Sequence, residues 1–116
     1  GDVYKRQIQY GEPLRAGLGI KLLPDSVAKR RNWKGVLFWS VVPDSAAAMA
    51  GLQPSGRDVM GRFVAGDRII GIGGSPIASS LDLFRALEQH KVGDTVAVDV
   101  VRKNKKRRLQ VTLQRL

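Results

Sequence analysis

Apolar and polar residues alternate most regularly in the last part of the chain. The valines at 96, 98 and 100 share one face of an extended segment, and the apolar residues at 109, 111 and 113 do the same in a second segment. A period of two residues is typical of a strand with one buried face. The pattern therefore predicts two adjacent strands, joined as a hairpin by the basic turn Lys103 to Lys106.

Other segments carry their own signals. Apolar and β-branched runs predict strands at 18–23, 35–42 and 67–72. A short alanine-rich helix is predicted after Ser45, which would be its N-cap, with Gly51 just beyond its end. A longer helix is predicted from Ser79 or Ser80 to about His90. Residues 26–31 predict a helical turn, and the glycine-containing stretch 53–66 predicts a long loop.

These elements predict an α+β fold. We expect a small, mostly antiparallel sheet capped by two helices. The chain of 116 residues is long enough to bury a core as one domain.

The longer helix has more apolar surface than a single core-facing stripe requires. Leu83 and Ala86 are predicted to face the sheet. Ser80, Phe84 and Leu87 recur at spacings of four and three residues and are predicted to line a groove beside the helix. A helix that is buried on two sides is the alternative.

Glycine spacing marks a second candidate feature near the start of the chain. Gly17, Leu18 and Gly19 form a turn that runs into a predicted strand containing Ile20, Lys21 and Leu22. Successive backbone N–H groups in such a turn can bind one anion, for which a terminal carboxylate is suitable. The following strand would then pair with an extended peptide. A simple bulge at the start of a strand is the alternative.

The net charge of +10 raises the question of an anionic partner. Much of this charge lies in two runs, at 29–31 and 102–108. Both are interpreted as solvated connections between elements, so no nucleic-acid partner is expected.

Little in the sequence indicates catalysis or a cofactor. The chain has no cysteine, which excludes disulfides and thiolate metal sites. Its one histidine, His90, is placed in the last turn of the long helix, where a surface position is expected. The acidic residues have no metal-ligand spacing, and no membrane-spanning run occurs. We therefore expect no cofactor, no metal and no catalytic residue in this chain.

The first residues are interpreted separately. Residues 2–7 resemble the translated end of a transposon adapter used for sequencing libraries, so residues 1–7 are expected to be a non-native scar or a disordered end. Residues 8–16 are predicted to be a linker from a missing upstream domain, and residues 17–116 the folded domain.

The motifs in their order resemble a PDZ domain of the permuted kind found in Deg/HtrA serine proteases. The matching segments are Gly17-Leu18-Gly19-Ile20, Val41-Val42-Pro43-Asp44-Ser45-Ala46-Ala47, Ala50-Gly51-Leu52, Gly66-Asp67-Arg68-Ile69-Ile70, Asp82-Leu83-Phe84-Arg85-Ala86-Leu87 and Val92-Gly93-Asp94. The inserted stretch at 53–65 is similar to that of chloroplast-type and related bacterial members. It favours the PDZ domain that follows the protease domain.

The resemblance implies a PDZ-like fold, a small, mostly antiparallel β-sandwich or partly open barrel of five or six strands capped by two helices. It also implies a peptide-binding role without catalysis in this chain. Peptide-binding residues would be Gly17 to Leu22 together with Ser80, Phe84 and Leu87, and Arg15 would be a further contact for the carboxylate. Partners would be the C-termini or unfolded segments of substrates, and also the parent's own protease domain or neighbouring subunits of a trimer or larger oligomer. The parent protein would act in protein quality control outside the cytoplasm, in a periplasm or thylakoid lumen.

Two other functions remain open on sequence alone. The module could dock on its own protease domain or a neighbouring subunit through residues 53–66, with little binding of free peptides. A basic nucleic-acid-binding domain that uses residues 102–108 is the third hypothesis, although the aromatic residues are few and dispersed.

Overall fold

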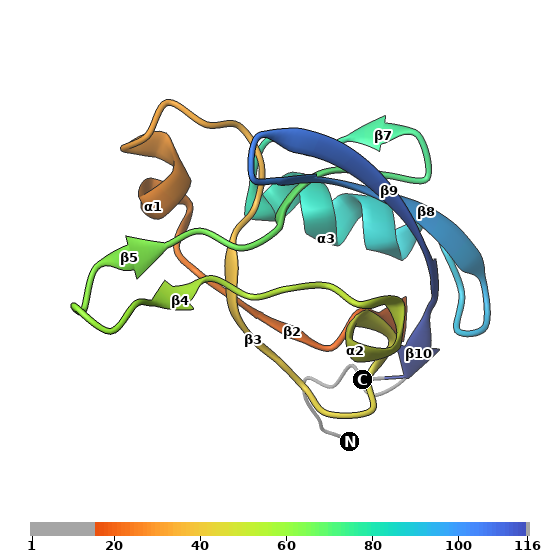
Figure 1. Cartoon of the computed structure of the whole chain (residues 1–116). Helices are drawn as coiled ribbons and strands as arrows, with labels where there is room; N and C mark the ends of the chain where they lie inside the picture. Colours follow the sequence, from red (N-terminus) through yellow and green to blue (C-terminus); the bar gives the residue numbers. More distant parts are fainter. Residues whose placement is uncertain (1–15, 116) are drawn as a thin grey trace, which may run out of the picture.

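The computed structural model describes residues 16–115. Its largest unit is a four-stranded antiparallel sheet with the order β7-β6-β8-β9 (Figure 1). The strands are β6 (Arg68–Ile72), β7 (Ser75–Pro76), β8 (Thr95–Arg102) and β9 (Lys105–Thr112). The predicted hairpin between the last two long strands is confirmed, because β8 and β9 pair along their whole length.

Three smaller pairs of antiparallel strands complete the described sheets. They are β1 (Ala16–Gly17) with β10 (Gln114–Arg115), β2 (Ile20–Leu22) with β3 (Phe38–Val41), and β4 (Gly56–Arg57) with β5 (Phe63–Val64). The predicted α+β class with mostly antiparallel strands is confirmed. Ala16 is predicted to be the last linker residue, but in the structure it belongs to β1 and pairs with Arg115 of β10.

The described residues form three helices, α1 (Asp25–Lys29), α2 (Ala46–Ala50) and α3 (Ser80–Glu88). The hydroxyl of Ser45 accepts a hydrogen bond from the backbone N–H of Ala48, and Gly51 ends α2 in the left-handed region, as predicted. Ser79 caps α3 in the same way. The predicted helical turn at 26–31 is the one-turn helix α1, which adds a third helix to the two expected.

The core lies between α2, α3 and the inner faces of the sheets. Val96, Val98 and Val100 of β8 are buried on one face, which confirms the alternation read from the sequence. Leu83 and Ala86 of α3 are buried against this core, also as predicted. The shared apolar cluster joins α3 to the start of the chain, because Leu18 belongs to it and Ile20 and Leu22 pack against it.

Two segments differ from their predictions. Residues 53–66 contain the hairpin β4–β5 instead of a simple loop, and this hairpin projects from the body on the side of α1 (Figure 1). The basic run at 102–108 is mostly strand, because only Lys103 and Asn104, both with positive φ, form the turn. Because β9 pairs with β8 along its whole length, it begins before the alternating apolar residues, and its cations lie at strand positions.

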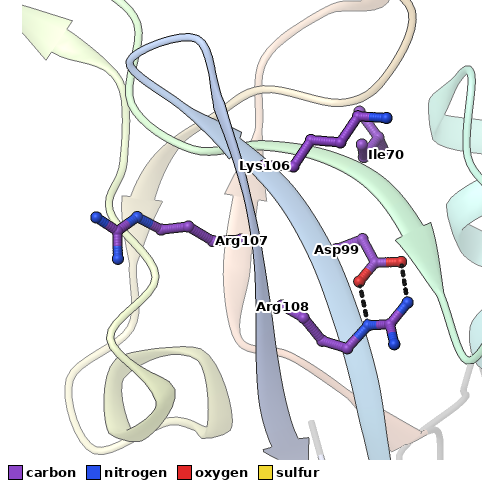
Figure 2. A pocket seen from close by; sticks show the side chains of 5 residues that line it. All are labelled: Ile70, Asp99, Lys106, Arg107 and Arg108. Atoms are coloured by element: carbon purple, nitrogen blue, oxygen red, sulfur yellow. Dashed lines mark hydrogen bonds and ion pairs between the residues drawn. The ribbon is translucent and has the colours of Figure 1, made fainter.

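One of these strand cations forms a surface ion pair on the outer face of the β8–β9 hairpin (Figure 2). Arg108 lies directly across from Asp99 in the ladder and donates hydrogen bonds of 2.7 and 3.3 Å to its carboxylate. The hydrogen bond from Arg108, and to a smaller extent the nearby positive charge, lowers the pKa of Asp99 below its ordinary value. The same pair raises the pKa of Arg108.

This pair predicts an acid-dependent loss of stability. Because the pKa of Asp99 is lowered by folding, its stabilising effect is present above the unfolded-state pKa of about 4. The effect is lost as the pH falls through the lower folded-state pKa. Asp99→Asn should therefore lower the urea midpoint slightly at neutral pH and less at acidic pH, since the pair is solvent-exposed. An equal difference between the two proteins at both pH values would contradict this prediction.

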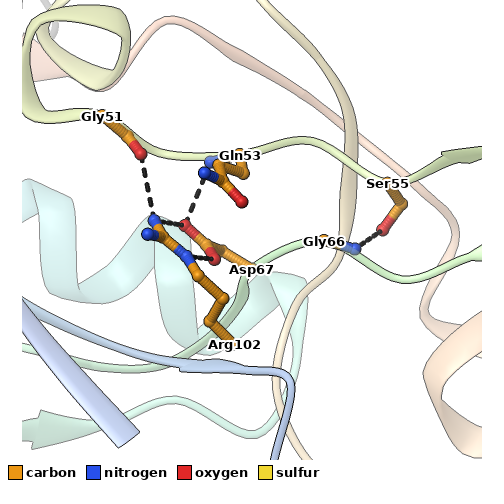
Figure 3. Close-up of polar contacts among 6 residues, drawn as sticks. All are labelled: Gly51, Gln53, Ser55, Gly66, Asp67 and Arg102. Atoms are coloured by element: carbon orange, nitrogen blue, oxygen red, sulfur yellow. Dashed lines mark hydrogen bonds and ion pairs between the residues drawn. The ribbon is translucent and has the colours of Figure 1, made fainter. Parts of the chain in front are cut away.

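A second ion pair, between a fully buried carboxylate and a guanidinium that is 18% exposed, closes the base of the β4–β5 hairpin (Figure 3). Asp67, with no exposed surface, accepts hydrogen bonds of 2.6 and 2.8 Å from Arg102 and one of 3.0 Å from the backbone N–H of Gln53. Arg102 also donates to the carbonyl of Gly51, at the end of α2. The hydrogen bond with Asp67 raises the pKa of Arg102, which keeps the guanidinium charged.

Candidate functional site

The turn before β2 has its carbonyl groups engaged and its amide groups available. The carbonyl of Leu18 accepts from the backbone N–H of Ala47, and the carbonyl of Gly19 accepts from that of Val42, both at 2.8 Å. Within residues 16–115 the structure gives the N–H groups of Leu18 and Gly19 no hydrogen-bond acceptor. Two successive donors without an acceptor are what an anionic group would require.

Gly19 is required by the shape of this turn. Its φ of +82° lies in the left-handed region, which other residues rarely adopt. A Cβ atom at this position would lie 2.3 Å from Cβ of Ser45, the N-cap of α2. The start of α2 therefore packs directly on the turn, and any side chain at residue 19 would displace it.

Strand β2 has an edge without a partner among the described residues. It pairs with β3 on one side, and the sheet of which it is part contains only these two strands in the described range. Ile20 and Leu22 are half-buried against the core, whereas Lys21 is exposed. The Lys21 ammonium lies 5.4 Å from the ring centre of Trp39, which is itself exposed on β3.

The three residues of α3 that are predicted to line a groove differ in their exposure and in their contacts. Phe84 is 46% exposed, and Leu87 is buried within the core cluster. Ser80 is engaged by Asp25 of α1, which accepts hydrogen bonds from the Ser80 N–H at 3.0 Å and from its hydroxyl at 2.9 Å. Sequence reasoning missed Asp25, because its partner lies 55 residues away and no local pattern links them.

The predicted binding residues from 17 to 22 thus lie in one continuous turn and strand, and α3 shares their apolar cluster. Arg15, the further predicted contact for a carboxylate, lies outside the described residues, as do the predicted scar and residues 8–15 of the predicted linker. Peptide binding by residues 17–22 and by α3 stays a prediction.

The described residues offer no grouping of side chains for metal binding. No cluster of three or more potential metal ligands occurs among residues 16–115. His90 lies at the end of α3, with Nδ1 3.8 Å from the Asp94 carboxylate. In the same range, no helix has the length and apolar character needed to cross a bilayer.

Comparisons with known proteins agree with this fold. The family model for the PDZ domain matches residues 16–113, and the chain belongs to this family. Over 114 residues it is 39% identical to Protease Do-like 1, chloroplastic, of Arabidopsis thaliana, a match that covers 98% of this chain and 26% of that protein. Over 93 residues it is 31% identical to a probable periplasmic serine endoprotease DegP-like of Ectopseudomonas mendocina, covering 72% of this chain and 20% of the relative.

A solved structure gives the same fold. The PDZ domain of HtrA3, bound to a phage-derived ligand (FGRWV), superposes with a TM-score of 0.65 at 19% identity, over 89% of this chain and 88% of that one. At this identity the likeness shows the fold alone. The chain is mainly a PDZ domain, and it spans about a quarter or less of the protease relatives, whose catalytic domain it does not cover. The predicted resemblance to Deg/HtrA-type proteases is confirmed.

Proposed function

We propose that this PDZ domain binds the C-terminal end of a polypeptide as an added strand on β2. The observation that carries the proposal is the combination of an edge of β2 without a partner strand and two adjacent amides without an acceptor in the described residues. The amides of Leu18 and Gly19 would hold the terminal carboxylate, and β2 would supply the main-chain pairing. The solved HtrA3 PDZ domain, which is bound to a phage-derived ligand (FGRWV), supports this choice.

The side chains around this edge indicate the ligand class. Ile20, Leu22 and Leu87 belong to or pack on one apolar cluster, and Phe84 on α3 is half exposed. A terminal apolar side chain would bury its surface there, and the bulk of Phe84 favours a small or medium residue. Ser80 has a smaller role than its spacing predicts, because its hydroxyl already donates to Asp25.

The biological setting follows from the relatives and is part of the proposal. We infer that the parent protein is a Deg/HtrA-type serine protease in which this domain recognises C-termini or unfolded segments of substrates and controls protease activity or assembly. The chloroplast and periplasmic names of the relatives favour a location outside the cytoplasm, in a thylakoid lumen or periplasm.

The direct test compares one apolar peptide as a free acid and as its C-terminal amide. The free acid should bind in the micromolar range, about −8 kcal/mol, measured by fluorescence anisotropy or calorimetry. The amidated peptide should bind at least about tenfold more weakly, because it lacks the charged carboxylate to which the N–H groups of Leu18 and Gly19 would donate.

Equal affinity for the two peptides would overturn the carboxylate role. No binding of either peptide would favour the alternative, a docking module for the parent's own protease domain or a neighbouring subunit. A peptide methylated on the backbone nitrogens that pair with β2 serves as a second control, since it keeps the carboxylate but prevents strand pairing.

A further inference from the structure

The hairpin β4–β5 exposes two apolar side chains at its turn. Val59 is fully exposed, and Met60 is 72% exposed. We call these two residues the apolar tip. The hairpin that carries them projects from the body of the domain (Figure 1).

The turn that presents the apolar tip is fixed by polar contacts. The carboxylate of Asp58 accepts hydrogen bonds from the backbone N–H groups of Met60 and Arg62, both at 2.9 Å. The Asp58 carbonyl accepts from the N–H of Gly61, and Arg57 donates to the Gly61 carbonyl, again at 2.9 Å. The tip is thus held outward by its own turn and gains nothing from burial within the domain.

A group of cations lies on the same side of the molecule. Lys29, Arg30, Arg31 and Arg57 are all exposed, and we call them the cationic rim. The guanidinium of Arg31 lies 4.3 Å from the ring centre of Phe63 in β5, which joins the end of α1 to the hairpin. The run at 29–31, predicted to be a solvated connection, is exposed, and its Arg31 contacts the hairpin that carries the apolar tip.

Acidic groups near the rim are already engaged. Asp58 forms an ion pair with Arg62, with 3.3 Å between Nε and Oδ2. Asp25, at the start of α1, accepts two hydrogen bonds from Ser80. With Arg62, the four cations of the rim outnumber the carboxylates of Asp25 and Asp58, so this side of the domain has a net positive charge.

We propose that the apolar tip and the cationic rim dock this domain on the surface of an anionic lipid bilayer. A bilayer interface accepts protruding apolar groups without a preformed socket, and each nearby Lys or Arg strengthens binding by about fivefold. A protein partner would need a contact of about 800 Å² on each side, which would have to extend well beyond the two side chains of the apolar tip. Binding to nucleic acid would use the cations but would leave Val59 and Met60 without a role.

The test is flotation of the 116-residue chain with vesicles of phosphatidylcholine alone or of phosphatidylcholine mixed with phosphatidylglycerol. Binding should occur only with the anionic vesicles and should weaken as salt increases. Met60→Asp should lower the partition coefficient at least about tenfold, and Arg30→Glu at least about fivefold.

Matched controls are available in the same chain. Met49 on α2 is 76% exposed, so Met49→Asp introduces the same change away from the tip and should leave vesicle binding intact. Lys91→Glu reverses an exposed charge beyond α3 and should have little effect. Circular dichroism melts should show that all four variants remain folded, because none of the substituted side chains is part of the core cluster.

Three outcomes would overturn the proposal. The first is no binding to anionic vesicles at low salt. The second is that Met60→Asp leaves vesicle binding unchanged and that RNA displaces the vesicles from both proteins equally well. This result would indicate only non-specific attraction to polyanions. The third is that the protein does not bind vesicles but forms dimers, and that Met60→Asp dissociates these dimers. This result would assign the tip to a contact between copies of the chain.

Discussion

Asp67→Ala is expected to lower the free energy of unfolding by about 3 kcal/mol, the lower end of the usual cost of breaking a buried ion pair from one side, because Arg102 is partly exposed. Asp67 has no exposed surface and receives two hydrogen bonds from Arg102. Its removal also leaves the backbone N–H of Gln53 without its acceptor. Urea unfolding at neutral pH, followed by circular dichroism, measures the loss.

The surface pair of Asp99 and Arg108 is the internal control, because it has the same chemistry in an exposed position. Asp99→Ala should destabilise the domain far less than Asp67→Ala.

A double variant distinguishes the loss of the ion pair from a general disruption of packing around Asp67. Asp67→Ala combined with Arg102→Met removes both charges, so it should cost about 2 kcal/mol less than the sum of the two single changes. Strictly additive losses would show that the two side chains are not coupled.

The contacts of Asp67 also explain a limit of sequence-based prediction. Periodicity identified the strands and helices that bury apolar faces, and Ser45 and Gly51 marked the ends of α2 correctly. The hairpin β4–β5 has no apolar period, and each of its strands has only two residues. It is held by the carboxylate of Asp58 and closed at its base by Asp67, whose partner Arg102 is 35 residues away. Such contacts appear only after the chain has folded.

The candidate site was more accessible to sequence reasoning than the hairpin. Gly17 and Gly19 indicated a special turn, and the structure places that turn beside β2 with two available amides in the described range. What the sequence could not show is why Gly19 is needed, since the obstacle is Ser45, 26 residues further along. The engagement of Ser80 by Asp25 was hidden for the same reason.

Gly19→Ala is expected to abolish measurable peptide binding, a loss of at least about a hundredfold, if the turn holds the carboxylate as proposed. The added Cβ would lie 2.3 Å from Cβ of Ser45, so the turn or the start of α2 must move. The required φ of +82° adds about 1 kcal/mol of strain for a residue other than glycine. Anisotropy with the free-acid peptide measures the binding, and a thermal melt measures the accompanying loss of stability.

Ser45→Gly separates these two causes. Glycine at residue 45 removes both side-chain atoms that lie near the added Cβ, and the next atom, Cα of residue 45, is 3.7 Å away. Glycine is also an acceptable N-cap, so the single change should cost α2 only a few tenths of a kcal/mol. Gly19→Ala with Ser45→Gly should therefore recover much of the peptide affinity, leaving only the cost of the positive φ. If the double variant binds no better than Gly19→Ala, the packing of Ser45 on the turn is not what positions the two amides.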